Sequence, residues 1–102
     1  MIDTAELRLS MFEPLVGSVF QTRGSGCADS LELVAAVEMK DLSGHGRSAG
    51  CFRLTFHGAS TEITLGQGQY VLSHEAIGEM VMMLMPRARL ENGTVRYSAT
   101  FS

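Results

Sequence analysis

The amino-acid sequence predicts a mainly β fold: a small antiparallel barrel or roll of about six strands with a short N-terminal helix. Apolar and polar side chains alternate with a period of two in residues 30–40, 50–58 and 94–101, which is typical of strands with one buried face. Turn-forming residues separate these stretches at intervals of roughly ten residues. Several short strands with regularly spaced turns favour a closed all-β architecture.

Length and composition indicate a single domain over residues 1–102. Of the 102 residues, 45% are hydrophobic and 19% are charged, which is enough apolar mass for an independent core. The net charge of −3 argues against a general nucleic-acid binder, which needs a basic surface. No apolar run approaches the ~20 residues that span a bilayer, and the first residues lack the pattern of a secretion signal. We therefore expect a cytoplasmic protein that binds neither nucleic acid nor membrane.

The first expected element is a helix confined mainly to residues 4–13. Four apolar side chains recur at helical spacing and define one face: Leu7, Met11, Phe12 and Leu15. Pro14 lacks a backbone N–H and disfavours a helical residue before it, so the helix should end at Glu13. A first strand is expected at residues 19–22, followed by a flexible turn at residues 23–26.

The longest alternating stretch, residues 30–40, is expected to be an antiparallel strand with one face in water. Its apolar face would comprise Leu31, Leu33, Ala35, Val37 and Met39. A helix is the alternative, because Leu, Glu, Ala and Met all favour helices. A helix would scatter the charged residues around its circumference, so the pattern favours the strand.

Two further strands, residues 50–58 and 66–74, are expected to organise the sheet. The first carries Phe52, Leu54 and Phe56 on its apolar face and Arg53, Thr55 and His57 on its polar face. The preceding residues 41–50 are polar and glycine-rich, and we expect them to form the most mobile internal loop.

Residues 80–85 are six consecutive apolar residues. A helix is possible by local propensity, but Gly78 and Pro86 oppose it, and a short apolar run between such residues fits a strand buried on both faces. We expect the core to cover one face and a partner subunit or the N-terminal helix to cover the other. Met83 and Met85 are therefore candidate partner-binding residues.

A hairpin with a two-residue type I′ turn at Asn92 and Gly93 is the strongest local prediction, because both positions of this turn need positive φ. Such a turn would place Arg89 directly opposite Arg96. The polar face of the hairpin would then gather three arginines: Arg87, Arg89 and Arg96. These side chains either extend into water or meet an acidic surface of a partner.

Several short segments stand out together. They are F-E-P-L-V-G at 12–17, F-R-L-T-F-H-G at 52–58, Q-G-Q-Y-V-L-S-H at 67–74 and Y-S-A-T-F at 97–101, with Ile77, Gly78 and Pro86 between them. In combination, over residues 11–102, they resemble a family of short bacterial proteins catalogued as a domain of unknown function. The resemblance implies a compact, mostly β domain in a non-secreted setting, encoded near phage-tail-like collar proteins, and it brings no catalytic residues. Residues 80–85 depart from the alternation expected of the family.

The sequence shows no motif for catalysis, metal binding or a cofactor. Cys27 or Cys51 could act as a nucleophile with a histidine, but neither lies in a signature, so structural cysteines are expected. The three scattered histidines lack metal-ligand spacing, and His74 is expected to hydrogen-bond a turn. The glycines of residues 41–50 lack the Gly-Lys-Ser/Thr ending of a phosphate-binding loop.

The pattern as a whole favours a non-enzymatic structural or protein-interaction module, an accessory of a phage-tail-like assembly. A small barrel that binds an apolar molecule among its methionines is the alternative, and an enzyme is less favoured. We expect no cofactor. We do expect a protein partner or self-association. The candidate partner-binding residues are Arg87, Arg89, Arg96, Met83 and Met85.

Overall fold

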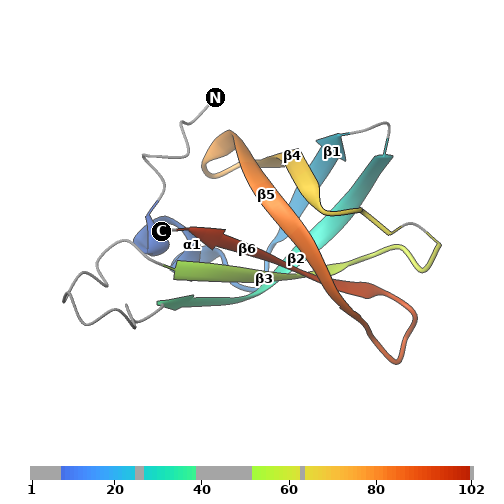
Figure 1. Ribbon diagram of the computed structural model, residues 1–102. Coiled ribbons are helices and arrows are strands. Elements are labelled where there is room, and N and C mark those ends of the chain that lie inside the picture. The colour runs from blue at the N-terminus through green and yellow to red at the C-terminus, as the bar shows by residue number, and fades with distance from the viewer. Residues whose placement is uncertain (1–7, 25–26, 39–51, 63, 102) are drawn as a thin grey trace.

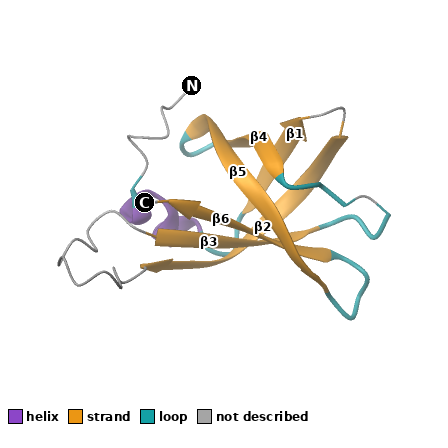
Figure 2. Cartoon of the chain, viewed as in Figure 1, coloured by secondary structure: helices purple, strands orange, loops and turns teal. Residues whose placement is uncertain are grey.

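Six antiparallel strands form a closed barrel with a short helical segment before the first strand (Figures 1 and 2). The computed structural model describes residues 8–24, 27–38, 52–62 and 64–101. The elements are α1 (Leu9–Phe12), the 3₁₀ turn η2 (Glu13–Leu15), β1 (Val19–Gly24), β2 (Cys27–Glu38), β3 (Phe52–Gly58), β4 (Gly68–His74), β5 (Gly78–Arg89) and β6 (Val95–Phe101). The strand order is β1-β2-β3-β6-β5-β4, and β4 pairs again with β1. The predicted fold class is confirmed.

The period-two alternation predicts which side chains fill the barrel. Phe52, Leu54 and Phe56 of β3 are all buried, as are the inward-facing residues of β6: Val95, Tyr97, Ala99 and Phe101. These two strands lie side by side although β4 and β5 separate them in the sequence. Apolar burial on this inner face is the main force that holds the sheet closed. In the described ranges, no helix is long and apolar enough to cross a membrane.

The helical segment closes one end of the barrel. α1 ends at Phe12 and η2 contains Pro14, in agreement with the predicted helix end, while residues 4–7 of the predicted helix lie outside the described residues. The ring of Phe12 is fully buried, with its centroid 5.9 Å from that of Phe52 and 6.3 Å from that of Phe101. Figure 1 shows α1 beside the end of β6 and the start of β3, opposite the β5–β6 hairpin.

β2 is the predicted strand, but it does not keep one face inward along its length. Its register with β3 shifts by one residue between Leu33 and Ala35, so Val34 is an extra residue that forms a β-bulge. One extra residue inverts the facing of every residue after it. Ala36 therefore packs against the core, and Val37 is 51% exposed. The expectation of a single apolar face is wrong beyond Leu33.

The apolar residues 80–85 form part of β5, so the choice of strand over helix is confirmed. Met80, Met82 and Leu84 are buried in the core, whereas Val81, Met83 and Met85 lie on the other face. Met83 is 47% exposed. The expectation of burial on both faces is wrong for this chain alone, because α1 packs beside β2 instead of covering β5. Cover by a partner stays a prediction.

The β5–β6 hairpin occurs where it is predicted, but its turn contains three residues instead of two. The Leu90 N–H donates to the Thr94 carbonyl (2.7 Å), and the Gly93 N–H donates to the Leu90 carbonyl (2.9 Å). Gly93 has φ +88°, as expected for a three-residue loop with glycine in the left-handed region. The Asn92 side chain stabilises this loop, because its Oδ1 accepts from both the N–H (3.1 Å) and the hydroxyl (2.7 Å) of Thr94.

The longer turn shifts the hairpin register by one residue. Arg89 lies opposite Val95, and Arg96 lies opposite Ala88, so the predicted Arg89–Arg96 pair is wrong. A second register shift follows between Pro86 and Ala88, next to a proline whose ring offers no N–H to the ladder. The three arginines of the hairpin therefore do not share one face.

Thr22 is a polar residue inside the barrel. It is buried on β1, and its hydroxyl has no hydrogen-bond partner among the described residues. We expect Thr22→Val to raise the free energy of unfolding by about 1 kcal/mol, because valine has the same shape without the unpaired hydroxyl. Thr22→Ser is the matched control, and it should lower stability because it keeps the hydroxyl and removes a methyl group. Urea denaturation measures both, and a destabilised Thr22→Val would show that the hydroxyl has a partner.

Two tyrosines fix the segment before β4 to the barrel. The Leu65 N–H donates to the Tyr97 hydroxyl oxygen (2.9 Å), and the Tyr70 hydroxyl donates to the Gly66 carbonyl (2.8 Å). Burial raises the pKa of Tyr97, and the hydrogen bond from Leu65 opposes this effect only in part. The folded protein therefore favours the neutral phenol.

The raised pKa of Tyr97 predicts a loss of stability in alkali. The phenol of the unfolded chain ionises near pH 10. The stability that the neutral Tyr97 phenol contributes to the folded state is therefore complete below that pH, and it is lost as the pH rises through the higher folded pKa. Tyr70→Phe leaves Tyr97 as the only tyrosine. We expect its tyrosinate absorbance to develop above pH ~10 and together with unfolding. Ionisation of Tyr97 at the ordinary tyrosine pKa, in a barrel that stays folded, would contradict this prediction.

Candidate functional site

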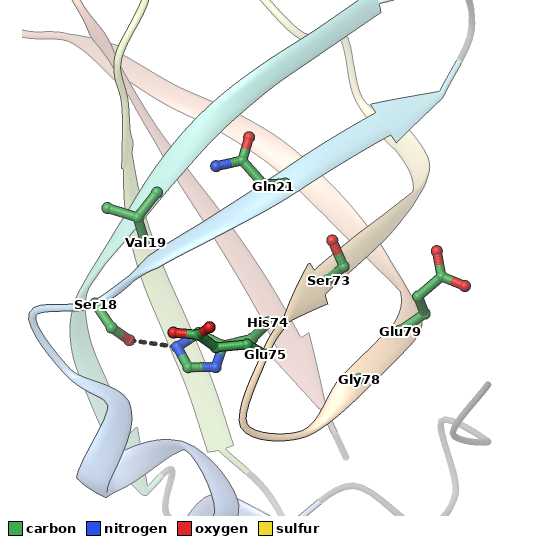
Figure 3. A pocket seen from close by; sticks show the side chains of 8 residues that line it. All are labelled: Ser18, Val19, Gln21, Ser73, His74, Glu75, Gly78 and Glu79. Atoms are coloured by element: carbon green, nitrogen blue, oxygen red, sulfur yellow. Dashed lines mark hydrogen bonds between the residues drawn. The ribbon is translucent and has the colours of Figure 1, made fainter.

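One candidate site is a depression between β1 and the β4–β5 turn (Figure 3). It contains Ser18 and His74, whose Oγ and Nε2 atoms are 3.0 Å apart, with Glu75 in the lining. A serine hydrogen-bonded to a histidine is the usual arrangement of an activated nucleophile. The direction of each hydrogen bond decides whether this pair can act as one.

The hydrogen bonds show that Ser18 is not activated by His74. The Ala76 N–H donates to Nδ1 of His74 (3.0 Å), so Nδ1 has no proton and Nε2 of the neutral ring carries it. Nε2–H then donates to the Ser18 hydroxyl, which itself donates to the Leu15 carbonyl. His74 holds the β4–β5 turn and the chain before β1 together, which confirms the predicted turn hydrogen bond.

The second candidate site is a depression of about 640 Å³ on the outer surface of the barrel, across β2, β3, β6 and β5. We call it the arginine groove. Its polar lining comprises Arg53, Thr55, His57, Arg87, Arg96 and Ser98, and the bulged part of β2 completes it. Adjacent strands in the barrel bring these residues together, because Thr55 lies opposite Ser98 and His57 lies opposite Arg96.

Two of the arginines are held by hydrogen bonds at the groove. Nε of Arg87 donates to Oγ of Ser98 (2.7 Å), and Nε of Arg96 donates to Nε2 of His57 (3.4 Å, a long bond). Ser98 is only 5% exposed, so it forms the floor of the groove. The bond to Ser98 fixes the orientation of Arg87 and leaves its terminal nitrogens available to a ligand.

Within the described part of the chain, the arginines of the groove have no carboxylate partner. The ion pair found there joins Arg23 and Glu79 (2.7 Å) outside the groove, and both side chains are largely exposed. Such a surface pair contributes about 0–1 kcal/mol. Three guanidinium groups without an ion pair therefore concentrate positive charge on one face of a chain whose net charge is −3.

The family model for a domain of unknown function, DUF6916, matches residues 7–101. The chain belongs to the DUF6916 family. No curated protein and no solved structure matches the chain. The match covers all six strands and α1, so the barrel with its arginine groove is the DUF6916 domain of this chain.

The DUF6916 barrel separates the predicted partner-binding residues. Arg87 and Arg96 both line the arginine groove, whereas Arg89 bonds to the Gly93 carbonyl (2.7 Å) and the Thr64 hydroxyl (3.0 Å). Arg89 therefore stabilises the hairpin. Met83 and Met85 lie on the outer face of β5, and Met85 is directly opposite Ser98.

Sequence reasoning missed Arg53, Thr55 and Ser98 as parts of one site. All three lie on polar faces of alternating strands, which is the signal that could have identified them. Their convergence depends on the pairing of β3 with β6, two strands far apart in the sequence. Without that pairing, the polar face of each strand reads only as a solvated surface.

Other candidate groups give no metal site in the described residues. No group of three His, Cys, Asp or Glu there could hold a metal ion. Cys51 and the whole of residues 41–50, which include His45 and for which a mobile loop is predicted, lie outside the described residues.

Proposed function

We propose that this DUF6916 domain is a non-enzymatic protein-interaction module that serves a phage-tail-like assembly. The main support is the outer surface of β3, β6 and β5, which combines the arginine groove with exposed methionine. Arginine and methionine are both enriched in the buried centres of protein–protein interfaces.

The two kinds of side chain lie next to each other on the barrel. Met85 is opposite Ser98, the floor of the arginine groove, and Met83 is two residues along the same face of β5. Val81 extends this apolar strip by two more residues and lies opposite Val71 of β4. A partner that covered the groove and the strip would bury apolar area beside charged groups, which gives both affinity and orientation.

The barrel interior favours surface recognition over chemistry. The inward-facing side chains of all six strands pack into one core, and the methionines Met80 and Met82 are part of it. The Ser18–His74 pair holds a turn and has its protons on the wrong atoms for nucleophilic attack. The phage-tail-like setting comes from the family resemblance, and tail genes beside the coding sequence in its host would support it.

The proposal is tested by capture from an extract of the host with the purified domain as bait. Met83→Lys combined with Met85→Lys should abolish capture of a tail component. The partner would have to remove water from the two introduced lysine charges in order to bind this surface. Arg23→Gln is the control, since it removes a surface charge outside the groove. The same proteins captured by all three baits would refute the proposed surface. Retention of an apolar molecule by the purified protein in native mass spectrometry would instead favour a ligand-binding barrel.

A further inference from the structure

The polar lining of the arginine groove presents hydrogen-bond donors. Arginine has donors only, and Arg53, Arg87 and Arg96 together supply three positive charges. Ser98 already accepts from Arg87, so its own O–H proton remains to be donated. Among the residues that the structure describes, no carboxylate lines the groove. Glu32, which is opposite His57 in the β2–β3 register, lines a different depression.

His57 follows the same pattern. Its Nε2 accepts from Nε of Arg96, so the proton of the neutral ring lies on Nδ1, which is a donor. A site that offers donors and positive charge, with a nearly buried hydroxyl at its floor, is complementary to an oxyanion. A neutral polar ligand would leave many of these donors without acceptors.

The residues that carry these donors are spread along the strands. On the shared β3–β6 ladder, Arg53 is opposite Thr100 and Arg96 is opposite His57, which puts the two arginines four residue positions apart. At about 3.3 Å per residue, their backbone positions are separated by roughly 13 Å. Thr55 and Ser98 lie between them as a directly opposed pair. A ligand longer than one carboxylate or phosphate matches this backbone span better.

We propose that the arginine groove binds an extended acidic segment of the protein partner, with carboxylates on alternate residues. In an extended chain, alternate side chains point to the same side and recur about every 6.6 Å, so residues i and i+4 match the separation of Arg53 and Arg96. Guanidinium groups bind carboxylates through two parallel hydrogen bonds. This inference rests on the proposed function and names the feature of the partner that the groove recognises.

The charge of the whole domain favours such a segment over a nucleic acid. A net charge of −3 opposes a long polyanion that extends beyond the groove, whereas a short acidic segment meets mainly the local positive field. Among the described residues, the groove also lacks a phenylalanine, tyrosine or tryptophan side chain on which a base could stack.

The test uses a short synthetic peptide with glutamate at alternate positions and serine between them. Its binding to the intact protein is measured by fluorescence anisotropy at low salt and mapped by amide chemical shifts. We expect shifts around Thr55 and Ser98. Arg53→Gln combined with Arg96→Gln should weaken binding about tenfold or more, and Arg23→Gln should leave it within about twofold. Added salt should weaken binding, because exposed charge pairs are screened.

Three control ligands decide what the groove recognises. A peptide with glutamine in place of glutamate should not bind, and inorganic phosphate and a short oligothymidylate should bind more weakly than the acidic peptide. Equal or tighter binding of phosphate or of the oligonucleotide would overturn the inference, as would peptide binding that the double arginine variant retains. If the peptide fails while capture of a tail component still depends on Met83 and Met85, the interaction function stands and the acidic-segment inference is wrong.

Discussion

Replacing Phe12 by alanine is expected to lower the free energy of unfolding by about 3–5 kcal/mol, the largest effect of any single substitution considered for this protein. Phe12 is fully buried, and its ring contacts an aromatic cluster at one end of the barrel. The centroids of Phe12 and Phe20 are 6.3 Å apart, and the rings of Phe52 and Phe101 stack at 4.6 Å. Alanine would leave a cavity that these neighbours cannot fill without moving.

The loss should be large because Phe12 also attaches the helical segment to the barrel. A helix of four residues has no stability of its own, so α1 exists only through its packing. Small domains are stable by roughly 5–15 kcal/mol, and Phe12→Ala removes a large part of that range. Urea denaturation followed by circular dichroism measures the change.

Val16→Ala is the matched control for Phe12→Ala. Val16 lies four residues further along the chain and is 45% exposed, so its truncation should cost well under 1 kcal/mol. Phe12→Leu should fall between the two variants, because leucine fills most of the space without the ring contacts. A Phe12→Ala protein as stable as Val16→Ala would mean that α1 does not close the barrel.

The sequence predicted the barrel well where strands are regular and failed where a strand contains an extra residue. The alternation of residues 52–58 names the buried side chains of β3 correctly. In β2 the bulge at Val34 inverts the facing, and no local residue type signals it, because a bulge needs only a small backbone change. Pro86 did carry a signal for the second shift, since proline within a strand is found at edges and bulges.

The candidate site was less predictable because it depends on strands that are distant in the sequence. Arg87 and Arg96 belong to one hairpin, and their common surface could be anticipated. Arg53 joins them only because β3 and β6 pair across the barrel. The turn length mattered as well: one more residue in the hairpin loop moved Arg89 away from the other arginines. Local chemistry thus identified the right residue types, and tertiary register decided which of them meet.

Gly58 is a position where only the smallest side chain fits, and Gly58→Ala should lower the free energy of unfolding by about 1–3 kcal/mol. A Cβ at this buried position would lie 2.8 Å from Oδ2 of Asp29 and 3.2 Å from Cε2 of Tyr97. Asp29 is not free to move away, because Oδ1 accepts from the Ser30 N–H (2.8 Å) and Oδ2 from the Ser60 N–H (3.5 Å).

Gly66→Ala is the control, since a Cβ there meets no atom within 4 Å. It should be neutral or stabilise the protein by about 0.4–1 kcal/mol, because alanine restricts the unfolded chain. Asp29→Ala combined with Gly58→Ala separates the two obstacles. If the carboxylate is the main one, Gly58→Ala should cost less in the Asp29→Ala background than in the native chain, and the difference measures the coupling. An unchanged cost would assign the crowding to the Tyr97 ring, which cannot withdraw because its hydroxyl accepts the Leu65 N–H inside the barrel.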